Sequence, residues 1–479
     1  MDDRLTFNHG ASTLAPRHTG RAERTHAPRP APPRTPRVSA RVRAAAEKAD
    51  LSYWGVFAFT ALLFFRPQDS VPALEPLHLP DLAAISALVA MGVRRITRNL
   101  TPIPFTPELG LLAALAAVMV LTAPFSIWPS GALSTFTDLF LKVVLVFVLL
   151  THSLTAPRLL RRFTWLIIVA MGYVAARGVL DYARGENLLL GRLKGAVPGL
   201  MGNPNDLAMN MVTFLPFAAF AALARGPRLP RAIAGLVSVL MVATLLFTKS
   251  RAGFLALAVT GVLIIVQARR IRPGITGVVI IGALLLPPFL PQSFWTRASS
   301  IVNAEEDETG SRAARMDLFN DGWDAFMEHP FTGVGAGQFQ NYNPPDRREP
   351  WRETHNVELQ VLSELGLFGG LVFTALLVRG IHTLVATWRT LRARRRHPQA
   401  ALLDAAFDPT ELEWMRVHVA ACIAAFAGWL VCAQFGSIGY HWTLYYVLAL
   451  VVAAAGITVR RLEAARLDPT ARAGLGSPA

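Results

Sequence analysis

The chain has 479 residues, of which 53% are hydrophobic and only 16% are charged, and this composition is too apolar for an ordinary soluble domain. The formal net charge of +15 does not indicate nucleic-acid binding, because the arginines occur in short groups between apolar runs and not as a stripe on one domain. Both observations favour a protein that spans a lipid membrane. Cys422 and Cys432 lie in one apolar stretch, so they predict packing and neither a disulfide framework nor a zinc site.

Residues 1–50 are rich in Arg, Pro, Ala and Thr and hold too few apolar side chains to build a core, so we predict a disordered basic tail. About twelve apolar segments follow, judged against the ~20 residues that a membrane span needs. They lie near 51–65, 81–93, 108–125, 136–152, 163–180, 206–224, 232–247, 253–268, 274–290, 365–387, 417–434 and 441–458. The predicted fold is therefore all-α, a polytopic integral membrane helical bundle of about 12 transmembrane helices.

Basic residues in the connecting loops predict the orientation of these spans. They occupy every second loop, as Arg94, Arg95 and Arg98; Arg158, Arg161 and Arg162; Arg225, Arg228 and Arg231; Arg269, Arg270 and Arg272; Arg389 to Arg396; and Arg460 with Arg461. By the positive-inside rule these loops and both termini are cytoplasmic. The predicted division is nine spans in 51–290, a large outer loop 291–356, three spans with a basic cytoplasmic loop in 357–460, and a cytoplasmic tail 461–479.

Two of the outer loops are long, near 181–205 and 291–356, and long loops are where function is expected. Within the second, Ser311–Glu328 is predicted to be an amphipathic helix. Its apolar residues recur at three- and four-residue spacing, as Met316, Phe319, Trp323 and Phe326 with Met327. We expect this short helix to lie on the membrane surface or against the bundle. Arg312 and Arg315 lie in its first turns.

The end of this loop combines glycines with a histidine. The segment Gly333-Val-Gly-Ala-Gly337 is either a plain turn or a turn whose bare backbone approaches a ligand. Thr354-His355-Asn356 then leads directly into a membrane helix that carries Gly366 and Gly369. A neutral histidine at this boundary is able to take a proton from a hydroxyl, and the alternative is a satisfied polar side chain without a reaction.

Arg251 follows Lys249 and Ser250 on the outer side, against the positive-inside bias. A local anionic partner explains this position better than contact with lipid headgroups alone. If Arg251, Arg315 and His355 converge, they predict a site for a lipid-linked phosphate or pyrophosphate. Guanidinium groups bind phosphate oxygens in a bidentate manner and keep their charge, so no metal is needed to hold a leaving pyrophosphate.

Four motifs in order carry a resemblance to a known family. His355-Asn356, followed by nine residues and Gly366-Leu-Phe-Gly369, resembles the His-Asn-x9-Gly-x-x-Gly signature of the O-antigen ligase and polymerase superfamily of bacterial inner membranes. Ser250-Arg251-Ala-Gly253 is similar to its Ser-Arg-Gly/Ala-Gly motif, and Gly202-Asn-Pro-Asn-Asp-Leu207 resembles its Asn-Pro-Asn segment. The stretch from Arg315 through His329-Pro330 to Gly333-Val-Gly335 and Phe339 follows its loop pattern.

The resemblance implies a metal-independent glycosyltransferase without a cofactor, in the inner membrane, with 291–356 as a large periplasmic loop. Its donor would be an undecaprenyl-pyrophosphate-linked glycan, and its other partners membrane lipids and no nucleic acid. Carried over by position, His355 would be the base, and Arg251 and Arg315 would bind the pyrophosphate. The implied substrate-binding residues are Asn203, Asn205, Asn356, Arg312 and Ser250. For Arg312 the alternative is a solvent-facing side chain, and for Asn203–Asp206 it is a helix cap.

The implied acceptor is lipid A-core, another glycan chain, as in a polymerase, or a protein hydroxyl, as in a protein O-oligosaccharyltransferase. A different class, a polysaccharide or lipid transporter, would favour ionisable groups deep within the spans. Here the chemically suggestive residues lie in the outer loops, so the sequence favours the enzyme.

Overall fold

The computed structural model describes residues 49–97, 105–196, 200–269, 311–342, 352–393 and 398–467, with Asn99, Gly274, Gly277 and Trp295 as single residues. The described residues belong to one compact unit, Pro36–Ala479. Several predicted features lie outside this described part. They are the tail 1–48, the span 274–290 apart from two glycines, most of 291–310, the loop 343–351 and the C-terminal residues 468–479.

Helices dominate the described residues, which confirms the prediction of a polytopic helical bundle. Ten of these helical segments are long and apolar enough to cross a membrane, and Leu51–Phe65 is a shorter apolar helix. Helices satisfy their own backbone hydrogen bonds, so this architecture suits a chain without water around it. The helices that build the bundle are α2 (Leu51–Phe65), α4 (Leu79–Thr97), α5 (Pro107–Thr122), α7 (Leu141–Ser153), α8 (Pro157–Arg184), α9 (Pro204–Leu223), α10 (Arg228–Phe247), α11 (Arg251–Ala268), α15 (Val357–Leu391), α17 (Pro409–Ala433) and α18 (Trp442–Leu467).

Shorter elements connect these helices. They are α3 (Pro67–Ser70), η1 (Pro72–Leu77), η2 (Ala123–Phe125), α6 (Pro129–Ser134), the π-helical segment η3 (Thr135–Phe140), α14 (Ser311–Glu328), η6 (Phe339–Asn341) and α16 (Pro398–Ala406). The strands β1 (Leu188–Leu189) and β2 (Arg192–Leu193) form a small antiparallel hairpin, in which Leu188 pairs with Leu193.

The centre of the bundle is formed by α9, α17 and α18. In the most apolar part of α9 and α18, 78% of the residues are buried inside the protein, against 28% in α10 and α11. Trp429, Tyr445 and Tyr446 fill this centre, whereas Val239 and Val262 on the outer helices are exposed. Exposed aliphatic side chains on a membrane helix are expected to face lipid. Cys422 and Cys432 are free and buried in the centre, in agreement with a packing role.

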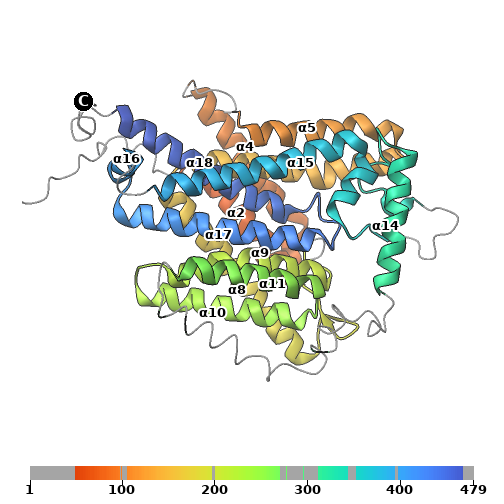
Figure 1. Ribbon diagram of the computed structural model, residues 1–479, viewed down its shortest axis with the longest axis horizontal. Coiled ribbons are helices and arrows are strands. Elements are labelled where there is room, and N and C mark those ends of the chain that lie inside the picture. Colours follow the sequence, from red (N-terminus) through yellow and green to blue (C-terminus); the bar gives the residue numbers. More distant parts are fainter. Residues whose placement is uncertain are drawn as a thin grey trace, which may run out of the picture. The chain divides into compact units, whose positions relative to one another are not determined.

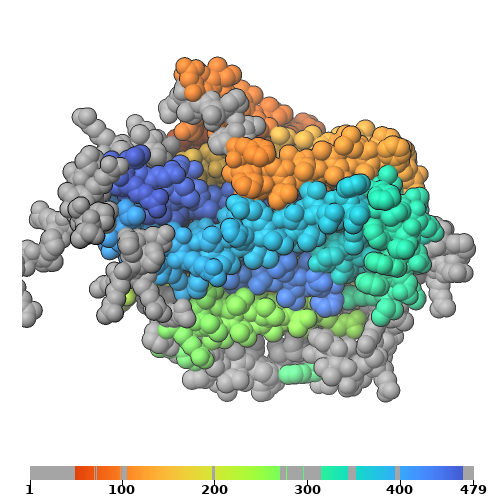
Figure 2. Space-filling view, turned by 45° about the horizontal axis from the view of Figure 1, so that its top comes forward, coloured from red at the N-terminus to blue at the C-terminus, as the bar shows by residue number. Residues whose placement is uncertain are grey.

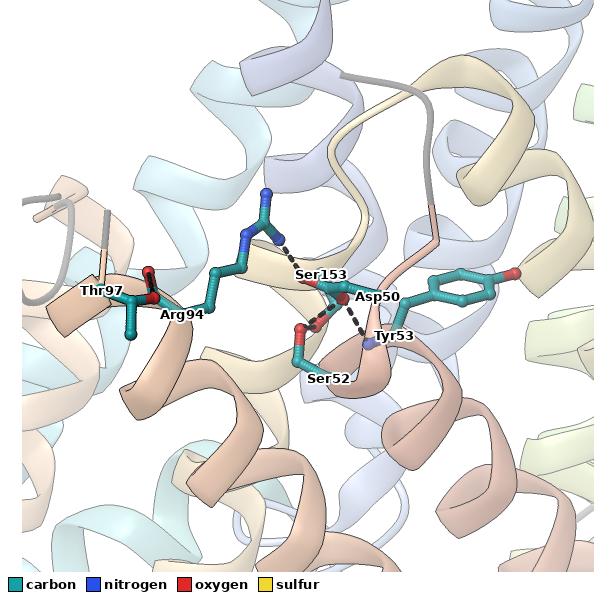
Figure 3. A network of polar contacts seen from close by, with 6 residues as sticks. All are labelled: Asp50, Ser52, Tyr53, Arg94, Thr97 and Ser153. Atoms are coloured by element: carbon teal, nitrogen blue, oxygen red, sulfur yellow. Dashed lines mark hydrogen bonds and ion pairs between the residues drawn. The ribbon is translucent and has the colours of Figure 1, made fainter. Parts of the chain in front are cut away.

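The basic loops gather at one end of the bundle, which we call the basic end. Asp50 caps α2 through the N–H of Tyr53 at 2.9 Å, and it forms an ion pair with Arg94 at the end of α4 (Figure 3). Ser153 at the end of α7 donates a hydrogen bond to Ser52 of the same network (Figure 3).

Other contacts at the basic end join the remaining basic loops. Arg460 after the membrane part of α18 donates to the Thr155 carbonyl at 3.3 Å. Arg225 lies 3.6 Å from Glu413, which joins the turn between α9 and α10 to the start of α17. Each of these contacts therefore joins two segments that the sequence placed on the same side of the membrane.

At the opposite end, which we call the site end, α14 lies across the ends of the long helices (Figure 1). In the space-filling view it covers part of this end beside α15 (Figure 2). Leu318 and Ala325 of α14 are buried, and Gly322 is packed so closely that a Cβ there would lie 2.7 Å from Leu359 of α15.

The helix Ser311–Glu328 thus has the predicted bounds, but the bundle contacts a different face from the predicted apolar stripe. Met316, Phe319, Trp323 and Met327 are all exposed. The helix therefore packs against the bundle, which is one of the two positions that the sequence predicted, and its apolar stripe is exposed on the other side.

Candidate functional site

A cavity of about 780 Å³ opens at the site end, and segments far apart in the sequence form its walls. Its lining comes from η3, the β1–β2 hairpin, residues 202–206 before and in α9, residues 337–340 after α14, residues 352–355, the start of α15, and residues 435–441 between α17 and α18. The cavity is of the size that holds a small ligand or part of a larger one. Four of its lining residues, Asn203, Asn205, His355 and Arg192, carry the polar chemistry described next.

His355 is held in an uncommon backbone conformation. Its φ angle is 52°, in the left-handed region, and its N–H donates to the Ser437 hydroxyl at 3.0 Å. Thr354 and Ser437 share a hydrogen bond of 2.9 Å, and Asn356 caps α15 by accepting from the N–H of Leu359 at 2.9 Å. These contacts fix the turn from the loop into α15, so the imidazole is positioned at the cavity wall by the loop between α17 and α18.

Burial and neighbouring charge keep the imidazole of His355 neutral. Burial, followed by the positive charges of Arg315 and Arg352, lowers the pKa of His355 to about 4. Each of these causes disfavours the protonated ring, because desolvation and like charge both oppose a second positive charge. The structure therefore brings Arg315 of α14 within electrostatic range of His355. At neutral pH the ring is a proton acceptor.

A second polar group joins two of the sequence motifs. Asn203 caps α9 by accepting from the N–H groups of Asn205 and Asp206 at 2.8 and 2.9 Å. The Asn205 side-chain oxygen accepts from the Ser250 hydroxyl at 2.9 Å and from Arg192 at 2.8 Å. Ser250 itself caps α11. The Asn203–Asp206 segment therefore caps α9 and also lines the cavity.

Arg251 is the first residue of α11 and is half-buried. Its neighbour Ser250 reaches the cavity wall through Asn205, whereas the described lining of the cavity contains neither Arg251 nor Arg315. Arg312 lies in the first turn of α14, and its side chain is outside the described part of the structure.

The glycine motifs explain how α15 is built. The helix is interrupted at Gly366, which has φ 66° and ψ −166°. The interruption leaves carbonyl groups of α15 without partners inside the helix. The segment Gly333–Gly337, the glycine loop, supplies these partners, because the N–H groups of Val334 and Gly335 donate to the carbonyls of Ser363 and Glu364 at 2.8 and 2.9 Å. In return, Leu367 donates to the Pro330 carbonyl at 2.7 Å. Buried backbone groups need such partners, so the loop and the break stabilise each other.

Only glycines allow this close approach. A Cβ at Gly333 would lie 2.2 Å from the Glu364 carbonyl carbon, and one at Gly366 would lie 2.5 Å from that of Phe331. The Gly333–Gly337 segment is therefore a turn that approaches a broken helix, not only a flexible connection. Its last glycine, Gly337, also lines the cavity and donates its N–H to the Glu364 carboxylate at 2.8 Å.

Several cavity residues were not predicted from the sequence. Arg192 and Arg352 bring positive charge to the lining, and Glu364 and Tyr440 form a buried polar pair beside it. Burial and the nearby Glu364 carboxylate raise the pKa of Tyr440 well above its usual value. The two arginines carry the same signal that singled out Arg251, namely positive charge in an outer loop. The sequence gives no such signal for Glu364, because its place in the cavity lining depends on the break in α15.

Comparison with known proteins points in the same direction as the motifs. Residues 236–374 match the family model described as O-antigen ligase. The matched range includes Arg251, α14, the glycine loop, His355 and Gly366, and it begins after the Asn203–Asp206 segment. No curated protein matches the chain. The resemblance predicted from the motifs is confirmed over the matched residues.

Proposed function

We propose that this chain is a membrane glycosyltransferase of the O-antigen ligase superfamily that moves a lipid-linked glycan onto an acceptor hydroxyl. The donor is an undecaprenyl-pyrophosphate-linked oligosaccharide or polysaccharide. The observation that carries this proposal is the neutral imidazole of His355 at a large cavity, within range of the guanidinium groups of Arg315 and Arg352. A proton acceptor beside fixed positive charge suits a reaction that creates a hydroxyl nucleophile and a diphosphate leaving group.

In the proposed reaction, His355 takes the proton of the acceptor hydroxyl as the oxygen attacks the anomeric carbon of the donor sugar. The bond between that carbon and the diphosphate oxygen breaks, and its electron pair leaves with the diphosphate. Arg315 and Arg251 stabilise the negative charge that develops there, without a metal. The products are the glycosylated acceptor and the lipid diphosphate, and the imidazolium returns its proton to solvent.

The low pKa of His355 is compatible with this role once the donor is bound. An imidazole with a pKa of about 4 is a weak base, because Arg315 and Arg352 oppose its protonation. A bound diphosphate offsets those positive charges and so raises the pKa of His355 toward neutrality. The base would therefore become stronger only when the donor occupies the cavity.

The position of the cavity supports a reaction on the periplasmic side of the inner membrane. The cavity lies at the site end, and the basic loops lie at the opposite end. Basic loops are retained in the cytoplasm, so the site end would face the periplasm, with both termini cytoplasmic.

The test is transfer in vitro with purified protein and a synthetic undecaprenyl-pyrophosphate glycan. We expect release of undecaprenyl pyrophosphate by the wild type and a loss of at least about a hundredfold in His355→Ala. His78→Ala is the matched control, because His78 is exposed and does not line the cavity. Undiminished release by His355→Ala would contradict the proposal. Movement of intact donor across the membrane without release would favour a transporter instead.

A further inference from the structure

The hairpin β1–β2, which contributes to the cavity lining, ends in a row of exposed leucines. Its strands pair Leu189 with Arg192, so Leu190 and Gly191 form a two-residue loop between them. Leu188, Leu189 and Leu190 are all exposed, and Leu190 is 91% exposed. Single exposed leucines are common on any protein, but three in succession at the tip of a loop are unfavourable in water. We call Leu189 and Leu190 the leucine tip.

The backbone of the leucine tip is as unusual as its exposure. Leu190 has a φ angle of 51° and Gly191 one of 69°, as a two-residue turn of type I′ requires. Asn, Asp and Gly dominate the first of these positions, because the left-handed region is unfavourable for a bulky L-residue. In a turn surrounded by water, an asparagine at position 190 would satisfy the backbone better and would expose less apolar surface. A leucine that meets neither preference indicates a functional constraint on its side chain.

The base of the hairpin is fixed to the bundle. Leu193 is buried, and a Cβ at Gly178 of α8 would lie 3.3 Å from its Cδ2. Arg192 donates to the Asn205 side chain at 2.8 Å and to the Thr248 carbonyl at 3.0 Å. The exposed leucines are therefore carried on a defined support, and their position at the cavity follows from the contacts of β2.

The hairpin lies at the depth where the hydrocarbon core of a membrane ends. The helix α8 begins at Pro157 at the basic end, and Gly178, which lies beside Leu193, follows twenty-one residues later. At a rise of about 1.5 Å per residue this distance is about 30 Å, which is the thickness of the hydrocarbon core. Leucines at this depth are within reach of a hydrocarbon chain.

The pairing of the strands places an apolar and a cationic side chain next to each other on the cavity wall. Leu189 and Arg192 are directly opposite in the hairpin, and both line the cavity. Opposite residues of an antiparallel pair carry their side chains on the same face. A lipid diphosphate has the same order of groups, because its hydrocarbon chain is attached directly to the diphosphate. The cavity that Leu189 lines is also the one proposed to hold the donor, so the donor chain fits this position better than a bulk phospholipid.

We propose, on the basis of the glycan transfer proposed above, that the leucine tip binds the part of the donor's isoprenoid chain that lies next to the diphosphate. Leu189 contacts the chain where it leaves the cavity, and Leu190 contacts it outside the cavity. This contact removes apolar surface of both the chain and the leucines from polar surroundings, which favours binding. The leucine tip thus recognises the lipid part of the donor and not its sugars.

The first experiment measures equilibrium binding to the full-length protein in nanodiscs. Two synthetic ligands carry the same glycan, one on undecaprenyl pyrophosphate and the other on methyl pyrophosphate, which has no isoprenoid chain. For Leu189→Asn and Leu190→Asn we expect Kd for the undecaprenyl ligand to rise about tenfold, as predicted for the loss of one apolar contact of leucine size. Kd for the methyl ligand should be the same in the variants and in the wild type.

Matched variants separate the proposed contact from a structural role. Leu190→Asn places a favoured residue in the turn, so its melting temperature should equal or exceed that of the wild type while its affinity for the undecaprenyl ligand falls. Leu190→Met keeps an apolar side chain and should bind this ligand as the wild type does. Leu229→Asn removes an exposed leucine in the first turn of α10 at the basic end, and it should change neither Kd.

The second experiment identifies the neighbour of the leucine tip directly. A photoreactive p-benzoylphenylalanine is introduced in place of Leu190 or, as the control, of Leu229. The protein is irradiated in phospholipid nanodiscs with the radiolabelled undecaprenyl ligand. We expect the group at position 190 to crosslink to the ligand and the group at position 229 to crosslink to phospholipid alone.

Three outcomes would overturn the proposed role of the leucine tip. One is wild-type affinity for the undecaprenyl ligand in folded Leu189→Asn and Leu190→Asn. Another is an equal loss of affinity for both ligands, which would mean that the leucines shape the cavity and do not contact the chain. The third is crosslinking from position 190 only to phospholipid or to a second copy of the protein. Neither experiment requires glycan transfer, so chain-dependent binding without transfer would contradict the proposed enzyme and still support the leucine tip.

Discussion

His355 combines a constrained backbone with an imidazole that resists protonation. Its left-handed φ angle of 52° is maintained by the Ser437 hydroxyl, so the ring is oriented by a loop about eighty residues further along the chain. Burial and two guanidinium groups then set its proton affinity. A lone histidine in a sequence gives no information on either property, because both depend on residues that only the fold brings near.

The pKa of His355 predicts the pH dependence of transfer. A base is active when unprotonated, so activity is lost as the pH falls through the pKa. With a pKa of about 4, roughly 90% of the free enzyme retains a neutral His355 at pH 5. We expect kcat/KM to decline only near pH 4, and kcat to decline at a higher pH because the bound diphosphate raises the pKa.

Rates measured between pH 3.5 and 8 would test this expectation, with samples returned to pH 7 to show that acid exposure is reversible. A decline of kcat/KM centred near the ordinary histidine pKa of about 6.5 would contradict the proposed electrostatic environment.

Arg192 donates hydrogen bonds to two segments that lie apart in the chain. It donates to the Asn205 side chain at 2.8 Å and to the Thr248 carbonyl at 3.0 Å. A lysine would retain the positive charge but not the pair of hydrogen bonds that the guanidinium group makes. In a double-mutant cycle of Arg192→Lys and Asn205→Ala on kcat/KM, we expect a coupling energy of about 1–2 kcal/mol. Strictly additive effects would show that the hydrogen bond does not support the site.

At the scale of elements, the broken helix α15 positions the chemistry. The segment from Val357 to Leu365 lies beside the cavity, and the segment after Gly366 continues through the bundle. The glycine loop satisfies the backbone groups that the break leaves free. This arrangement gives a physical reason for the spacing between His355 and Gly366, since nine residues form the short helix that joins His355 to the break.

Gly366→Ala is predicted to destabilise the protein. The backbone conformation at Gly366 is open only to glycine, and the added Cβ would lie 2.5 Å from backbone of Phe331. We expect a loss of at least about 3 kcal/mol and of transfer activity. The control is Gly261→Ala in α11, where a Cβ would meet nothing within 4 Å, and it should be neutral or slightly stabilising.

Thermal unfolding in detergent, with both variants measured side by side, would provide the comparison. Equal melting temperatures for Gly366→Ala and the wild type would mean that α15 tolerates another path at this position.

For the whole molecule, the described contacts separate two ends of one bundle. Asp50 with Arg94, Arg460 with Thr155 and Arg225 with Glu413 mark the basic end. The cavity and α14 mark the site end. A membrane between these ends would place the basic loops and the cavity in different compartments, which the proposed glycan transfer requires.

Single cysteines would test this orientation. Arg184 at the site end of α8 and Arg225 at the basic end are both exposed, and the two native cysteines are buried. A membrane-impermeant maleimide applied to intact spheroplasts should label Arg184→Cys, and it should label Arg225→Cys only after permeabilisation. The reverse pattern would place the cavity in the cytoplasm and contradict the proposed donor route.

The sequence alone predicted the helical bundle, the grouping of basic loops, the bounds of α14 and the motifs that the family match includes. These properties depend on local composition and periodicity. In a lipid bilayer, unpaired backbone groups and charged residues within a span are energetically unfavourable, so the local sequence reflects where each segment lies. The apolar stripe of α14 was identified as well. The sequence did not predict which face of that helix packs on the bundle, because the packing depends on Leu359 and the small residue Gly322.

The tertiary structure alone decided which polar groups meet. Arg192 reaches Asn205, Ser437 orients His355, and Glu364 receives the N–H of Gly337, although these partners lie between 13 and 82 residues apart in the chain. Residue type determines what each side chain is able to do, whereas proximity, burial and the field of neighbouring charges arise only when distant segments pack together.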